Sequence, residues 1–200
     1  MKINVIFTEP VLGTLAGNPK IAEEFIMSKH PKGVQLDELH AETPEGDLEK
    51  ACTVFPREDG KPFIWDYQLK GFFKEACIAM IETDTISQEE LKAARLTKYL
   101  FKRTIDNQIF VTPRKIFLDL CGTIGWCERP LRGMTMQGER ISVARSEEIP
   151  CGTEFEAYII CLNKKLVPYI KQWLNYGALK GLLQWRNSGK GRFAWSLLEE

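Results

Sequence analysis

The sequence lacks any Cys-x-x-Cys pair and contains only two histidines. Its six cysteines are scattered, and His30 and His40 are the only imidazoles that could join them as ligands. Structural zinc sites use four Cys or His ligands at short, regular spacings. This pattern therefore argues against a zinc site, and we expect no other metal and no cofactor. Cys77 and Cys161 lie in apolar runs, where a free thiol behaves as a small buried hydrophobic group.

The chain also lacks a hydrophobic run of membrane-spanning length, internal repeats and low-complexity linkers. It begins with an alternating strand pattern instead of a charged leader followed by an apolar segment. Together with the free cysteines, this predicts a cytoplasmic protein without a membrane partner. The 200 residues are 44% hydrophobic, which is enough for the core of a single domain spanning residues 1–200.

Acidic residues are missing from one long part of the chain. The formal net charge is zero, yet no Asp or Glu lies between Glu156 and Glu199, where seven lysines and arginines occur. Six acids crowd residues 37–49 instead. Such an asymmetry predicts that the C-terminal part faces a polyanion, which the overall charge conceals.

Hydrophobic periodicity predicts an alternation of strands and helices. Period-two alternation and short apolar runs predict strands at residues 2–11, 52–55, 63–65, 108–111, 115–120, 140–143, 155–162 and 193–197. Apolar stripes at helical spacing, with capping signals, predict helices at residues 18–29, 67–81, 87–103 and 164–176. Residues 30–50 are polar with little periodicity and indicate an insertion, and residues 85–104 indicate a helical embellishment.

This order of elements favours the α+β class. An antiparallel sheet with its helices on one face, related to the ferredoxin-like plan of the RNA-recognition fold, accommodates the elements most economically.

The stretch at residues 177–193 combines glycine, cations and aromatics. Glycines allow a backbone to bring its N–H groups close to a phosphate, while nearby cations supply charge and aromatic rings stack on bases. The opposing interpretation is a structural hairpin whose cations are only solvated. The candidate RNA-binding residues here are Lys180, Gln184, Trp185, Arg186, Asn187, Ser188, Gly189, Lys190, Gly191 and Arg192.

Two further segments are candidates for RNA contact. Lys70 lies near the start of a predicted helix, where backbone donors and an ammonium group could hold one phosphate. The segment 129–145 carries four arginines around an apolar tip that could wedge between bases: Arg129, Arg132, Arg140 and Arg145. A surface lysine and a long solvated loop are the plain alternatives.

Several short segments together resemble the RAMP superfamily, the repeat-associated proteins of CRISPR ribonucleoproteins, and above all the backbone subunits of type III effector complexes. The matching segments follow one another in the family's order. They are a small-residue turn after the first strand (residues 7–13), a hairpin before a helix with Leu-Lys-Gly (59–74), an arginine-bearing segment (140–145), a Pro-x-Gly-Thr-x-Phe strand entry (150–155) and a glycine-rich loop (181–191). The resemblance implies an RNA-recognition-like fold, RNA as ligand, and other effector subunits or further copies of the chain as partners in antiviral defence.

The resemblance does not extend to catalysis. The acidic residue that cleaves target RNA in type III backbone subunits would have to be Asp47 or Glu49, and the superfamily's general-base histidine would have to be His40 or His30. None of these residues fits its motif, so binding is favoured over cleavage. If four to six cations hold the RNA backbone, the logarithmic salt dependence should be about −0.7 per neutralised phosphate. Three alternatives stay open: a viral decoy or regulator of a CRISPR complex, a metal-independent endoribonuclease, and a plain interaction module.

Overall fold

The computed structural model describes residues 1–16, 52–83, 85–135 and 138–200, with the backbone alone for residues 131–142 within these ranges. The predicted helix at residues 18–29 and the predicted polar insertion at residues 30–50 lie outside these ranges and stay predictions.

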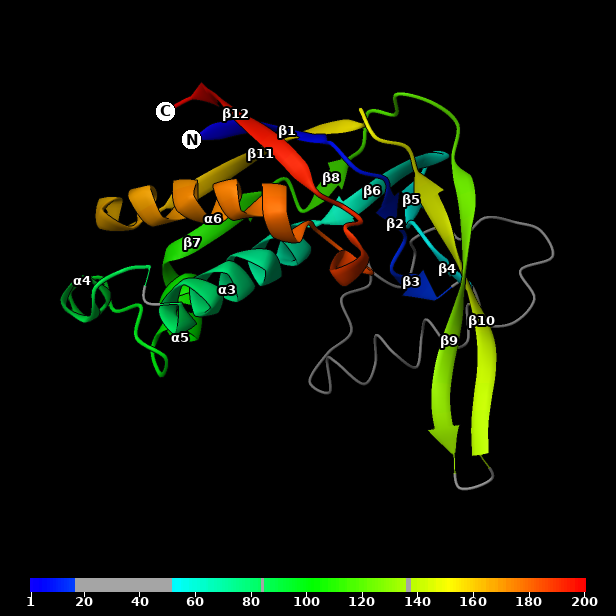
Figure 1. The fold of residues 1–200 in the computed structure, drawn as a ribbon. Coiled ribbons are helices and arrows are strands. Elements are labelled where there is room, and N and C mark those ends of the chain that lie inside the picture. Colours follow the sequence, from blue (N-terminus) through cyan, green and yellow to red (C-terminus); the bar gives the residue numbers. More distant parts are fainter. Residues whose placement is uncertain (17–51, 84, 136–137) are drawn as a thin grey trace, which may run out of the picture.

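Four strands form the central antiparallel sheet. They are β12 (Phe193–Glu199), β1 (Lys2–Phe7), β11 (Glu154–Cys161) and β7 (Ile109–Thr112), in that order across the sheet. The sheet brings the two ends of the chain together, because Lys2 lies opposite Glu199 (Figure 1). The first strand is shorter than predicted. It ends at Phe7, and Val11–Leu12 forms the separate strand β2.

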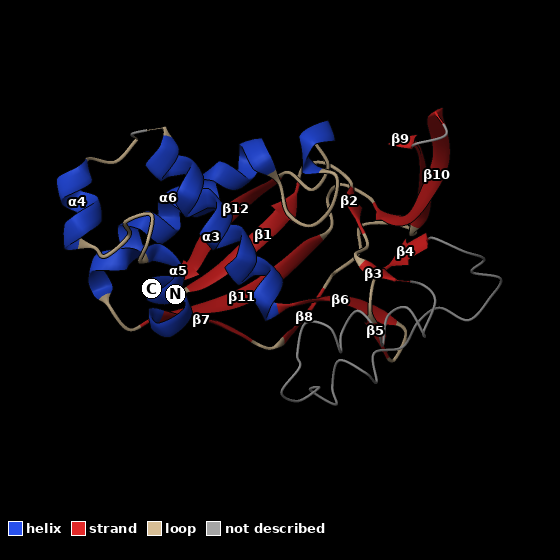
Figure 2. Ribbon diagram, turned by 90° about the horizontal axis from the view of Figure 1, so that it is seen from below, coloured by secondary structure: helices blue, strands red, loops and turns tan. Residues whose placement is uncertain are grey.

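Helices cover one face of this sheet. Figure 2 shows α3 (Asp66–Glu82) and α6 (Val167–Lys180) lying across the strands. Alternation explains the arrangement: Ile3, Val5 and Phe7 of β1 are fully buried beneath the helices, while Ile6 between them is exposed. Each large apolar side chain buried in this layer contributes about 1.5–3 kcal/mol. The predicted α+β class, with helices on one face of an antiparallel sheet, is confirmed.

The predicted helix at residues 87–103 is wrong in its extent. The capping box holds, since the Ser87 hydroxyl accepts from the Glu90 N–H, but α4 ends after six residues (Gln88–Ala93). Arg95 takes a positive φ of 56°, which turns the chain so that Leu96 enters the core. A second short helix, α5 (Phe101–Gln108), follows and runs up to β7. The turn at Arg95 lets Leu96 join Leu91 and Ala94 in the core.

The last helix is longer than predicted and runs through Gly177. It follows the 3-10 turn η1 (Lys164–Leu166). A Cβ at Gly177 would lie 2.0 Å from the Phe193 ring, so glycine here permits close packing of α6 on β12 and does not end the helix. The helix ends at Gly181, whose φ of 80° is one that glycine adopts without strain.

Two further sheets lie at the other end of the molecule. A five-stranded sheet joins β2, β3 (Leu15–Ala16), β4 (Cys52–Val54) and the long hairpin of β9 (Gly125–Thr135) and β10 (Gly138–Ile149). A three-stranded sheet joins β5 (Arg57–Glu58), β6 (Lys61–Trp65) and β8 (Lys115–Phe117). The strand β5 was not predicted; it lies between the predicted strands at residues 52–55 and 63–65 and forms a hairpin with β6.

The sequence prediction missed most of the long hairpin. Only residues 140–143 were expected as a strand, but β9 (Gly125–Thr135) pairs with β10 along its whole length, and the hairpin projects away from the helices (Figure 1).

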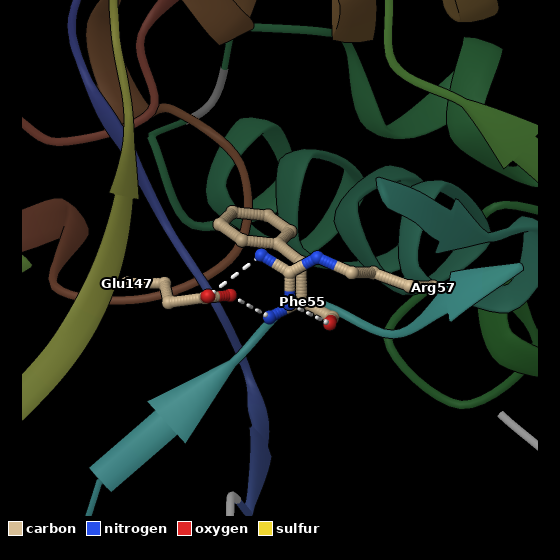
Figure 3. Close-up of polar contacts among 3 residues, drawn as sticks. All are labelled: Phe55, Arg57 and Glu147. Carbon is tan, nitrogen blue, oxygen red and sulfur yellow. Dashed lines mark hydrogen bonds and ion pairs between the residues drawn. The ribbon is translucent and has the colours of Figure 1, made fainter. Parts of the chain in front are cut away.

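A buried carboxylate anchors the base of this hairpin. Glu147 is 3% exposed and accepts hydrogen bonds from the Phe55 N–H at 2.8 Å and from Arg57 at 2.6 Å (Figure 3). The two donors come from the segment that follows β4, so a single side chain ties β10 to its neighbours. A buried charge that is paired and hydrogen-bonded in this way fixes geometry, and losing it leaves Arg57 uncompensated.

Candidate nucleic-acid interface

The glycine-rich stretch is a closed loop between α6 and β12. The Leu182 N–H donates to the Gly191 carbonyl at 2.8 Å, and the Gly191 N–H donates to the Pro10 carbonyl at 2.8 Å. A short 3-10 turn, η2 (Arg186–Ser188), lies between them, with the Gly189 N–H donating to the Arg186 carbonyl. These amides are used within the protein, so the loop does not present them as an open row of phosphate donors.

Three cations of this loop have carboxylate partners. Glu75 on α3 contacts both Lys180, at 3.3 Å, and Arg186. Glu148 on β10 contacts Lys190 at 2.6 Å. The acid-free run in the sequence therefore does not produce an unopposed positive surface here, because acids from other elements fold against it.

The loop presents Trp185 in a strained conformation. Its φ of 52° and ψ of 36° are left-handed, which is costly for a bulky residue, by about 1–2 kcal/mol. Trp185 is 39% exposed, and the Arg129 guanidinium lies 4.9 Å from its ring centre. Arg129 also donates to Gln184 at 3.0 Å, and Gln184 donates to the Gly13 carbonyl at 2.7 Å. These contacts hold an exposed aromatic ring beside a cation at the hairpin base.

The hairpin carries a second pair of this kind. The Arg145 guanidinium on β10 lies 4.3 Å from the centre of the Trp126 ring on β9. Trp126 is 41% exposed and the Arg145 side chain is 49% exposed, with Glu128 at 3.5 Å as a weak ionic partner. Aromatic rings and guanidinium planes of this sort are the groups on which unpaired bases stack.

The remaining predicted residues fall into different places. Lys70 does not join the loop: its ammonium donates to the Asp106 carbonyl at 2.9 Å, on the side of α3 that faces α5. Burial lowers the Lys70 pKa from its ordinary value, although the Asp106 charge opposes the shift. Arg192 is exposed and donates to the Leu179 carbonyl at 3.1 Å. Asn187 and Ser188 are exposed on η2.

Five predicted residues cannot be placed in the site. The side chains of Arg132 and Arg140 are outside the described part, although their backbones pair within the hairpin. The weak catalytic candidates Asp47, Glu49 and His40 also lie outside the described residues. Within those residues, no group of three or more His, Cys, Asp or Glu side chains could hold a metal ion. No helix in the described ranges is long and apolar enough to cross a membrane.

Sequence reasoning missed four residues that shape this surface: Glu75, Glu148, Trp126 and Gly13. The two acids are 111 and 42 residues from their partners Arg186 and Lys190, so no local pattern could reveal the pairs. Trp126 lies three residues before Arg129, which places the two side chains on opposite faces of β9. Its partner Arg145 is brought to it by the pairing of β9 with β10, which no local pattern revealed.

Comparison with known proteins shows a likeness of fold alone. No protein-family model matches the chain, and no curated protein matches it. Among solved structures, the chain is similar to one in a cryo-EM structure of the type III-B Cmr-beta complex bound to cognate target RNA. The two are 9% identical with a TM-score of 0.55, over 99% of this chain and 58% of the other.

A chain of a type IV-B CRISPR complex is also similar, at 10% identity and a TM-score of 0.46, over 98% of this chain and 88% of that one. The protein thus shares its fold with a subunit of the RNA-bound type III-B complex and spans little more than half of that subunit's length.

Proposed function

We propose that this chain binds single-stranded or guide-like RNA and acts as a backbone-type subunit of a CRISPR effector ribonucleoprotein, in the manner of the RAMP superfamily. The observation that carries the proposal is the pair of arginine–tryptophan stacks at the hairpin base. The fold shared with a subunit of an RNA-bound complex supports it.

The chemistry of the surface suits bases more than phosphates. Trp126 and Trp185 each keep about two fifths of their surface exposed while an arginine lies against the ring. An aromatic ring gains about 1–3 kcal/mol for each base stacked on it, without regard to base identity. An arginine beside the ring can contact the adjoining phosphate. Sequence-tolerant binding of an unpaired strand follows from this combination.

In the proposed function, the glycine-rich loop holds the Trp185 side chain in a fixed position. Its carboxylate-paired cations and inward-facing amides hold Trp185 in place before any ligand arrives, which lowers the ordering cost of binding. In the proposed role the loop therefore positions an aromatic platform, and the candidates Lys190 and Gly191 act mainly by keeping the loop in this shape.

RNA binding by ring variants tests the proposal. Trp185→Asn removes the ring, and asparagine tolerates the left-handed backbone; Trp126→Ala removes the second ring. Each should weaken binding to a single-stranded RNA oligonucleotide by roughly fivefold to a hundredfold. Tyr99→Ala is the matched control, because Tyr99 is 93% exposed near α5, away from the hairpin.

The measurement is fluorescence anisotropy with labelled single-stranded RNA, duplex RNA and single-stranded DNA, at equal salt. Circular dichroism checks that each variant is folded. Wild-type affinity in both folded tryptophan variants would refute the proposed function.

A further inference from the structure

The segment that contains α4 and α5 carries a run of cations far from the hairpin. No acid lies between Glu90 and Asp106 in the sequence, and five of the residues between them are basic. All five are exposed, and we call them the α4–α5 patch: Lys92, Arg95, Lys98, Lys102 and Arg103. Figure 1 shows α4 and α5 at the opposite end of the molecule from the β9–β10 hairpin, so the patch is separate from the arginine–tryptophan stacks.

The fold holds these cations near one another. The Thr104 hydroxyl on α5 donates to the Arg95 carbonyl at 2.8 Å, which fastens the turn after α4 to the start of α5. The fully buried Leu96 anchors the same turn in the core. Lys102 and Arg103 lie in the first turn of α5, beside this attachment. The patch is therefore a fixed surface of the protein.

The positive charge of the patch is not neutralised by neighbouring acids. Within the described ranges, none of the five cations forms an ion pair. The two acids that border the run are engaged elsewhere, since Glu90 accepts from the Ser87 hydroxyl and Asp106 contacts Lys74 at 2.6 Å. The patch differs in this respect from the glycine-rich loop, where carboxylates oppose three cations.

Two of these cations lie where a helix disfavours them. The N-terminus of a helix is the positive end of its dipole, so acids stabilise the helix there and cations destabilise it. The first turn of α4 contains Glu89 and Glu90, as this rule favours, whereas the first turn of α5 contains Lys102 and Arg103. Repulsion among the five cations adds to the cost, and a bound polyanion would remove both terms.

The composition of the patch suits phosphates more than a protein partner or unpaired bases. Lysine supplies three of the five cations and is depleted in protein–protein interfaces. Tyr99 is 93% exposed here, but no cation of the described residues lies over its ring, in contrast to Trp126 and Trp185. The phosphates on the outside of a double helix are bound by charge and require no stacking.

We propose that the α4–α5 patch binds the phosphate backbone of an RNA duplex, while an unpaired RNA segment binds at the hairpin base. The inference rests on the proposed function for the choice of RNA and adds a second contact of different chemistry to it. Because this contact uses charge alone, duplex affinity should fall steeply with salt, with a logarithmic slope of roughly −0.9 per neutralised phosphate, as on duplex DNA.

A blunt-ended RNA duplex tests the patch apart from the tryptophans, because it offers no unpaired base for stacking. In fluorescence anisotropy, Lys98→Gln combined with Lys102→Gln should weaken duplex binding about tenfold or more at low salt and make the slope shallower by about 1.8. Trp185→Asn should bind the duplex as the wild type does. The matched control is Lys61→Gln combined with Lys171→Gln, which removes two accessible lysines of β6 and α6 and should leave duplex affinity at the wild-type level.

The outcomes are distinct. A folded Lys98→Gln, Lys102→Gln variant with wild-type duplex affinity and slope overturns the inference, and so does an equal loss in the control variant. If circular dichroism shows that the double variant is unfolded, Lys98→Gln alone decides by the same comparison. A wild-type protein that binds no blunt duplex at low salt also overturns the inference, even when the tryptophans prove necessary for single-stranded RNA. Failure of the proposed function shows separately, as unchanged single-stranded RNA binding in the tryptophan variants.

Discussion

Replacing Glu75 with glutamine should weaken the fold slightly and strengthen RNA binding. Glu75 lies between Lys180 and Arg186, and all three side chains are 27–32% exposed. Two positive charges and one negative charge leave one net positive charge at this point. Glu75→Gln changes this local sum to two while keeping nearly the same side-chain shape.

The cost in stability is modest because the pairs are partly solvated. Such ion pairs contribute about 0–1 kcal/mol each, so losing two should cost at most about 2 kcal/mol. In a protein of this size that lowers the melting temperature by at most about 8 °C. The gain in binding free energy should be of similar size. One more phosphate neutralised by a charge-assisted contact corresponds to about a tenfold gain in affinity at low salt.

The decisive assay is the salt dependence of RNA affinity. With one more phosphate neutralised, the slope of log affinity against log salt should become steeper by about 0.7. Glu82→Gln is the matched control, because Glu82 lies two turns further along α3 and is exposed. A folded Glu75→Gln variant with the wild-type slope and affinity would show that Lys180 and Arg186 do not face the RNA.

Three further predictions concern the fold and its thiols. Glu147→Ala should destabilise the protein by about 3–5 kcal/mol in chemical denaturation, since it leaves the Arg57 guanidinium, whose side chain is only 14% exposed, without its counter-charge; a loss under 1 kcal/mol would contradict this. Gly177→Ala should cost at least about 1–3 kcal/mol, because its Cβ would overlap the Phe193 ring, and unchanged stability would mean that α6 shifts freely. Burial raises the Cys77 pKa to about 12, so at pH 8 this thiol should resist alkylation while the exposed Cys121 reacts; equal labelling by mass spectrometry would refute the burial.

Elements with one buried face could be predicted from the sequence. In α3, the residues Leu69, Phe72 and Phe73 recur at helical spacing because the core requires them on one side. In β11, Phe155 and Ala157 alternate with exposed residues for the same reason. In these elements burial of one face against the core produces both the spacing of apolar residues in the sequence and the observed helix or strand. The helix and strand predictions were therefore confirmed.

The hairpin and the loop were harder to predict for two different reasons. Much of the hairpin projects from the core, so neither face of β9 shows a sustained apolar pattern. Trp126 and Pro130, which lie on the same face of β9, are both exposed. In the loop, the cations could be found, but Glu75 and Glu148 are brought to them by tertiary folding. A local charge count is therefore a poor guide to local potential when acids elsewhere in the chain are available.

These carboxylates change the salt dependence expected of the wild type. Four to six unopposed cations would give a slope of about −3 to −4 on single-stranded RNA. Lys180, Arg186 and Lys190 share two carboxylates, which leaves Arg129, Arg145 and Arg192 as the described candidate arginines with mainly neutral or weak partners. Three such contacts give a slope of about −2, and Arg132 and Arg140 would each add about −0.7 where they contact phosphates. A slope near −4 that persists after Arg132 and Arg140 are replaced by alanine would mean that phosphates displace the carboxylates on binding. A slope near −2 would leave stacking on Trp126 and Trp185 as the larger share of the binding free energy.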